Sequence, residues 1–282
     1  MTLKYSTFNP SEAVKDVVRF YWLLESDEPY THHAMAGPCP ELLFHYRGRF
    51  REVFDNGGSE PSFVSGISAP TTLPRKFTID EGFGMFGIYL YPHAIPVLFD
   101  VPANELTNQM VDLDRLSKTL GPAFEDRMMN SNSTRERIQV AESFILRRLQ
   151  QKHMHRLPVV EAMKLVLHAR ANLKVKELSS LFSISERQLQ RQFVRYTGFT
   201  PQQFLRISRF QKALHLYGSD GMRLTDIALE CGYTDQSHFI RDFKQFSGIS
   251  PKKYFKEKIP YATFNPRMSR TAQSDRYNRW GF

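Results

Sequence analysis

The sequence repeats nearly the same phrase after fifty residues. SERQLQRQFVRYTGFTP runs from Ser185 to Pro201, and DQSHFIRDFKQFSGISP runs from Asp235 to Pro251. Identical pairs at this offset are Arg191 and Arg241, Phe193 and Phe243, Gly198 and Gly248, and Pro201 and Pro251. A repeat of this period is typical of a duplicated supersecondary unit. The C-terminal part of the chain is therefore expected to hold two copies of one unit.

Each copy is predicted to be a short helix, a turn of three or four residues and a second helix. Ser185, Thr200 and Ser250 stand where a helix N-cap oxygen is wanted, and Gly198 and Gly248 follow the second helices. The predicted helices cover about 158–171, 175–182, 186–196, 201–217, 224–231, 236–246 and 251–257. Two helices joined in this way are typical of a helix-turn-helix, whose second helix enters the DNA major groove.

The second helix of each copy has an apolar face and a polar face. With Leu189 and Phe193 inward, Arg187 and Arg191 point away from the core, as does Arg241 in the second copy. An Arg side chain can donate two hydrogen bonds to the O6 and N7 atoms of guanine, and a Gln side chain can bond to N6 and N7 of adenine. The free backbone N–H groups in the first turn of a helix can bind phosphate. The helix at 201–217 is apolar on most sides and is expected to be a buried strut between the two units. The candidate DNA-contacting residues are Ser185, Arg187, Gln190, Arg191, Gln236, Ser237, His238 and Arg241.

The net charge of +9 is concentrated in the same part of the chain. Residues 158–258 hold 17 Lys and Arg against 9 Asp and Glu, whereas residues 1–157 hold 17 against 19. A basic region beside a slightly acidic one favours a polyanionic partner. The alternative for the charge alone is a solvated, lysine-rich surface.

The stretch from about 158 to 257 resembles the DNA-binding domain of the AraC/XylS family of transcription regulators. The segments ISERQLQRQFVRYTGFTPQQFLRISRFQKAL and LTDIALECGYTDQSHFIRDFKQFSGISPKKY carry this resemblance. It implies two helix-turn-helix units that occupy successive major grooves of double-stranded promoter DNA, with RNA polymerase as a further partner if the protein is an activator. Tyr233 and Thr234 depart from the family, which usually has Phe and a small polar residue there.

The fold predicted for the whole chain is α+β with two domains. Short apolar runs between Gly, Pro and Asn breaks indicate a β-rich barrel or sandwich over the first ~115 residues, although Ser11 to Leu23 could be a helix. Helices are expected at 113–129 and 133–151, the latter either a dimer interface or packed on the barrel. The predicted domains are a regulatory domain at 1–130, a connector at 131–157, the DNA-binding domain at 158–258 and a disordered tail at 259–282.

The N-terminal half resembles the cupin-like sensory domains that precede the DNA-binding domain in one subgroup of the same family. The segment from Val64 to Leu116 carries this resemblance, which covers roughly residues 8–150 and reveals no ligand. Aromatic residues are dense here and either line an effector pocket or fill the barrel core. Candidate effector-binding residues are Trp22, Glu41, His45 and Tyr89.

Enzymatic chemistry finds little support in the sequence. His32 and His33 are adjacent and point to opposite sides of a strand, so they do not easily ligate one metal, and no cofactor is expected. Cys39 is either a sensor thiol or an ordinary partly buried cysteine, and Cys231 is expected in the core. The rival hypothesis is a cupin-type enzyme with a DNA-binding appendage. The polar start is unlike a signal peptide, and no apolar run has the length of a membrane span. Two isolated cysteines make neither a disulfide framework nor a structural zinc site, which favours a cytosolic protein.

Overall fold

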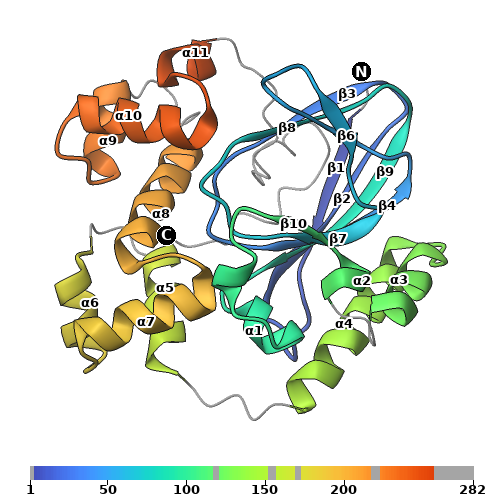
Figure 1. Ribbon diagram of the computed structural model, residues 1–282, viewed down its shortest axis with the longest axis horizontal. Helices are drawn as coiled ribbons and strands as arrows, with labels where there is room; N and C mark the ends of the chain where they lie inside the picture. Colours follow the sequence, from blue (N-terminus) through green and yellow to red (C-terminus); the bar gives the residue numbers. More distant parts are fainter. Residues whose placement is uncertain (1–2, 117–120, 152–156, 169–172, 217–222, 257–282) are drawn as a thin grey trace.

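The computed structural model describes residues 3–116, 121–151, 157–168, 173–216 and 223–256. Its N-terminal part is built on two antiparallel sheets and its C-terminal part is all helix (Figure 1). The predicted α+β fold class is confirmed. The predicted disordered tail at 259–282 and residues 152–156 of the predicted connector lie outside the described residues.

The two sheets lie face to face and have six and four strands. The six-stranded sheet has the order β1 (Lys4–Phe8), β2 (Val18–Ser26), β9 (Phe83–Leu90), β4 (Glu41–Arg47), β7 (Ser65–Ser68) and β10 (Met110–Asp112). The four-stranded sheet has the order β3 (Tyr30–Ala34), β8 (Arg75–Ile79), β5 (Arg51–Val53) and β6 (Ser59–Pro61). The N-terminal part is thus a sandwich.

Alternation along the strands sends the larger sheet's side chains into two separate cores. In β2, Tyr21 and Leu23 join one core, while Trp22 and Leu24 join the other, between the two sheets. The first core lies under helices that cover the outer face of the six-stranded sheet (Figure 1). These helices are α1 (Ala94–Phe99), α2 (Leu113–Leu116), α3 (Gly121–Met129) and α4 (Thr134–Gln150), with a 3-10 turn, η1 (Ala103–Glu105), after α1.

The expectation that Ser11 to Leu23 could be a helix is wrong. Residues 12–17 form turns, and β2 begins at Val18. Val18 pairs with Leu90, and Tyr21 pairs with Ile88 of β9, so the second half of this segment belongs to the six-stranded sheet. β-branched and aromatic side chains suit such a strand better than a helix.

Helix α4 packs on the sandwich, which was one of the two alternatives for this segment. Its N-cap is Ser133, whose hydroxyl accepts from the Glu136 backbone N–H. Val140, Ala141 and Ile145 are buried in the core that the helices share with the six-stranded sheet. The apolar face of α4 is therefore covered by this chain itself.

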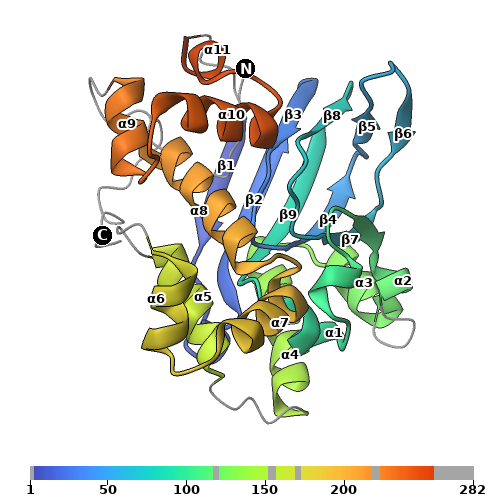
Figure 2. The same ribbon diagram turned by 60° about the vertical axis from the view of Figure 1, so that its left-hand side comes forward.

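The C-terminal helices follow the predicted ranges closely. They are α5 (Pro158–His168), α6 (Val175–Leu181), α7 (Glu186–Thr197), α8 (Pro201–Leu216), α9 (Leu224–Glu230), α10 (Gln236–Ser247) and α11 (Pro251–Lys256). The buried strut is α8, whose Phe204 and Phe210 lie edge-on to Phe193 of the first unit and Phe243 of the second, with ring centroids 5.4 and 5.3 Å apart. Figure 2 shows α8 running between the two units.

Within the described residues, none of the helices has both the length and the apolar character needed to cross a bilayer.

Candidate nucleic-acid interface

Helix α7 is the second helix of the first unit, and its ends are defined by local capping. The Ser185 hydroxyl accepts from the Gln188 backbone N–H at 3.2 Å, and Gly198 ends the helix in the left-handed conformation with φ of 79°. Leu189 and Phe193 are fully buried and hold the helix against the core. The predicted cap and inward face are confirmed.

The outer face of α7 carries the predicted readers of the first unit. Ser185, Arg187, Gln190 and Arg191 are all exposed. In the part of the chain that the structure describes, no hydrogen bond or ion pair engages the guanidinium of Arg187 or Arg191. Both guanidinium groups are therefore available to an outside acceptor such as a guanine edge or a phosphate.

Helix α10 repeats this arrangement in the second unit, with a different cap. The Asp235 carboxylate accepts from the His238 backbone N–H at 2.7 Å, and this hydrogen bond lowers the pKa of Asp235 below its usual value. Gln236, Ser237 and Arg241 are exposed, as predicted for readers. Phe239 and Phe243 are fully buried beneath them.

His238 differs from the other predicted readers because its ring lies partly inward. Its side chain is 30% exposed, with Nε2 3.7 Å from Asp242 Oδ2 and Nδ1 3.5 Å from Thr234 Oγ1. The ring also meets the edge of Tyr233, with centroids 5.3 Å apart. His238 is thus held by protein contacts on its inner side, whereas Arg241 is exposed.

An ion pair that is not predicted from the sequence joins α10 to the strut α8. Asp242 is 2% exposed, and its Oδ1 accepts from Arg206 Nη2 at 2.6 Å. Arg206 also donates to Gln245 and lies over the Phe246 ring, 5.4 Å from its centroid. A signal existed, because Asp242 falls three residues after Phe239 and four before Phe246, on the face that faces the core. A carboxylate at such a position needs a buried partner.

Three of the four candidate effector residues lie together on the inner face of the six-stranded sheet. Glu41 and Tyr89 are cross-strand partners, and Trp22 lies on neighbouring β2. Burial raises the pKa of Glu41 to about 8, and the Trp22 indole N–H opposes that rise. The Glu41 carboxyl is therefore largely protonated at pH 7. His45 is four residues further along β4, between Phe50 and Phe63, and burial lowers its pKa to about 4.

The two cysteines are both buried. Cys39 is 7% exposed beside Arg19, whose Nη1 lies 3.4 Å from the sulfur, and burial raises the pKa of the Cys39 thiol. A thiol in this setting matches the ordinary buried cysteine of the two alternatives. Cys231 lies in the helical core, as predicted.

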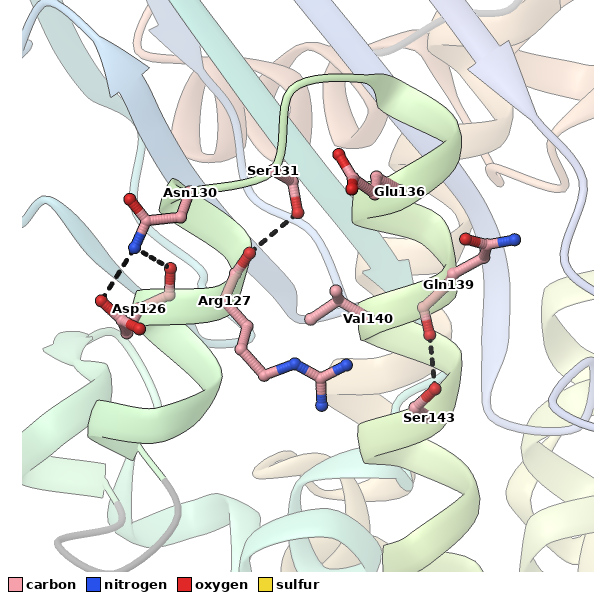
Figure 3. A pocket seen from close by; sticks show the side chains of 8 residues that line it. All are labelled: Asp126, Arg127, Asn130, Ser131, Glu136, Gln139, Val140 and Ser143. Atoms are coloured by element: carbon pink, nitrogen blue, oxygen red, sulfur yellow. Dashed lines mark hydrogen bonds between the residues drawn. The ribbon is translucent and has the colours of Figure 1, made fainter.

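No group of three or more His, Cys, Asp or Glu residues able to hold a metal occurs among the described residues. A polar pocket of about 650 Å³ lies between α3 and α4 (Figure 3). The hydrogen bonds drawn there close within each helix, as from Asn130 to Asp126 and from Ser143 to the Gln139 carbonyl.

Comparisons with known proteins divide the chain into two regions. Residues 178–257 match the family described as a helix-turn-helix domain, and residues 6–112 match a domain of unknown function, DUF6597. The HTH-type transcriptional activator RhaS of Klebsiella pneumoniae (strain 342) is 40% identical over 77 residues, 27% of this chain and 28% of that protein. RhaS of Escherichia coli (strain K12 / DH10B) is 42% identical over 71 residues, 25% of this chain and 26% of that protein. The chain thus matches little more than a quarter of the length of these curated relatives.

Two solved structures are similar to this chain over different shares of its length. ToxT from Vibrio cholerae is 12% identical with a TM-score of 0.45, over 91% of this chain and 98% of that one. A transcriptional regulator from Chromobacterium violaceum, described as of the AraC type, is 24% identical with a TM-score of 0.34, over 36% of this chain and 93% of that one. The duplicated helix-turn-helix, its buried strut and the sequence matches agree: the C-terminal part of the chain is a helix-turn-helix domain similar to that of the RhaS activators.

Proposed function

We propose that the protein is a sequence-specific DNA-binding regulator of transcription. Its two second helices, α7 and α10, would enter successive major grooves of double-stranded promoter DNA, about 34 Å apart. The observation that carries this proposal is the matched pair of capped helices, each with buried aromatic residues on one face and exposed Arg and Gln side chains on the other. The proposed DNA-contacting residues are Ser185, Arg187, Gln190, Arg191, Gln236, Ser237, His238 and Arg241.

The proposed division of the chain is a regulatory domain at 1–130, a connector at 131–157 and the DNA-binding domain at 158–258. We place the effector site on the inner face of the six-stranded sheet, at Trp22, Glu41, His45 and Tyr89. A neutral Glu41 carboxyl beside aromatic rings suits an apolar small molecule that bears one polar group.

The regulator would act in the cytoplasm, either alone or as a homodimer. Because the RhaS relatives are named activators, we propose RNA polymerase as a further partner. Those relatives give no support to the alternative of a cupin-type enzyme with a DNA-binding appendage, so we assign no catalytic residue.

Selection of binding sites from random duplex DNA with the full chain tests the proposal. The expected product is a long asymmetric motif with two blocks of fixed bases about one helical turn apart, because one chain carries two different readers. A variant with both Arg191→Ala and Arg241→Ala should lose the motif while keeping general, salt-sensitive binding. Enrichment of no motif, or of the same motif by the variant, would contradict the proposal.

A further inference from the structure

The N-terminal domain contacts the same repeated turn in both helix-turn-helix units. Gly198 and Gly248 occupy equivalent positions and end α7 and α10 with φ of 79°. The Gly198 carbonyl accepts from the Thr107 hydroxyl, after η1, at 3.3 Å. Gly248 lies beside Pro74, where an added Cβ would be 3.3 Å from Pro74 Cγ. Two turns fifty residues apart in sequence are therefore docked on one domain.

A second group of contacts inserts the segment after β3 into the helical domain. The Ala36 backbone N–H donates to the Phe246 carbonyl at 2.9 Å, and the Ala36 carbonyl accepts from Gln211 Nε2 on the strut α8. Ala36 is fully buried and belongs to the core of the helical domain. Asp16 adds an ion pair to Lys164 of α5 at 2.7 Å. The N-terminal domain thus contacts the first unit, the strut and the second unit.

These contacts form a second connection between the two units, in addition to the strut α8. The start of α8 packs on α7 through Phe204, and a later turn of α8 packs on α10 through Phe210. The N-terminal domain joins the same two units by a second path. Figure 2 shows α1 beside α7. The turn η1 also packs on α7, and the Ala36 backbone is hydrogen-bonded to Phe246 of α10. We call Thr107, Ala36, Pro74 and Gln211 the brace. Two parallel connections restrict the relative movement of the units more than one helix does.

The brace leaves the proposed DNA-facing surface uncovered. Thr107 and Pro74 reach the C-terminal ends of α7 and α10, whereas the exposed readers begin at the N-terminal ends with Arg187 and Gln236. These contacts are therefore compatible with α7 and α10 lying in the DNA grooves. They affect the relative orientation of the two helices.

We propose that the N-terminal domain, through the brace, sets the spacing between the two base blocks that this protein recognises. The inference rests on the proposed function. Successive base pairs are about 3.4 Å apart, so an added pair moves the second block by that distance and rotates it around the duplex. The braced units can meet only one spacing without breaking contacts. Thr107 and Gln211 are accordingly positioning residues that touch no DNA.

The test measures affinity of the full chain for its selected site and for the same site with one base pair added or removed between the blocks. The variants are Thr107→Tyr, which forces η1 away from α7, and Gln211→Ala, which removes the bond from the strut to Ala36. The matched control is Thr7→Tyr, at an exposed position on the edge strand β1.

The unaltered protein and Thr7→Tyr should lose about tenfold or more in affinity on the altered spacings, as for a mismatch in a specific site. Thr107→Tyr and Gln211→Ala should reduce that ratio to about twofold. An unchanged ratio in both variants would overturn the proposed role of the brace and leave the proposed function intact. A loss of affinity that is equal on all spacings would have the same meaning. If the unaltered protein has no two-block site, the proposed function fails and the brace with it.

Discussion

At the scale of single residues, α7 and α10 differ in the side chain that follows their equivalent arginines, Arg191 and Arg241. Arg191 is followed by Gln192, whose Oε1 is buried with no hydrogen-bond partner among the described residues. Arg241 is followed by Asp242, which is bonded to Arg206 of the strut. The second reader is therefore held to α8 by charge as well as by aromatic packing, and the first by packing and the contact with Thr107.

Replacing Asp242 tests the importance of this ion pair. Asp242→Asn keeps the shape and removes the charge, which leaves the Arg206 guanidinium without its buried partner, so we expect the free energy of unfolding to fall by about 1–3 kcal/mol. Asp235→Asn is the matched control, because Asn is as good an N-cap as Asp. This change should lower the free energy of unfolding by only a few tenths of a kcal/mol. Urea unfolding measures both, and equal small effects would mean that the ion pair contributes little.

Replacing Arg191 tests base reading. If Arg191 makes the proposed bidentate contact to guanine, Arg191→Ala should cost about 1–3 kcal/mol of binding free energy, confined to one base position. Competition binding against sites substituted at each position measures this. Lys176→Ala, an exposed change in the first helix of the same unit, is the control. Equal losses for Arg191→Ala on specific and random DNA would remove Arg191 from the base readers.

At the scale of elements, the helices from Pro158 to Lys256 are predictable because several of their ends carry capping residues that can be recognised in the sequence. Ser185, Thr200 and Ser250 each cap a helix as expected. Segments without such local signals were harder. Helix α1 is not predicted from the sequence, and a helix is left open as an alternative for Ser11 to Leu23, although pairing with β9 makes the second half of that segment a strand. The brace could not be predicted, because Thr107 and Gly198 are 91 residues apart and no local pattern joins them.

The glycines that end α7 and α10 offer a test of the docked turns. Both have φ of 79°, so Gly248→Ala should cost roughly 1 kcal/mol of stability from backbone strain alone. Gly198→Ala should cost more, because its added Cβ would lie 2.1 Å from Thr107 Oγ1. Thr107→Ala should relieve part of the extra cost. A double-mutant cycle by urea unfolding measures the coupling, and no coupling would argue against the contact.

At the scale of the whole molecule, the N-terminal domain holds several buried titratable groups. Burial lowers the pKa of His32, His45 and His93 to about 4. In the unfolded chain these rings take up protons near pH 6.5, so the free energy of unfolding falls as the pH falls from about 6.5 towards 4. Glu41, with its pKa raised to about 8, has the opposite sign, because stability falls as the pH rises from about 4.5 to 8. Between pH 7 and pH 5 the stability lost through the three histidines exceeds the stability gained through the one carboxyl.

The protein should therefore unfold at a lower temperature at pH 5 than at pH 7, by several degrees. His93→Leu should reduce this difference, because a fully buried ring that resists protonation is removed. His168→Leu, at an exposed histidine of α5, is the control and should leave the difference unchanged. The thermal midpoint at the two pH values measures the effect, and equal midpoints for the unaltered protein would contradict the assignment.

The central claim is that one chain reads two successive major grooves with α7 and α10. Methylation interference on the selected site, which reports guanines whose N7 must stay free, tests it most directly. For the unaltered protein, methylation should interfere with binding in two blocks about one helical turn apart on one face of the duplex. Arg191→Ala should erase one block and Arg241→Ala the other. A single block, or loss of the same block in both variants, would contradict two-groove reading.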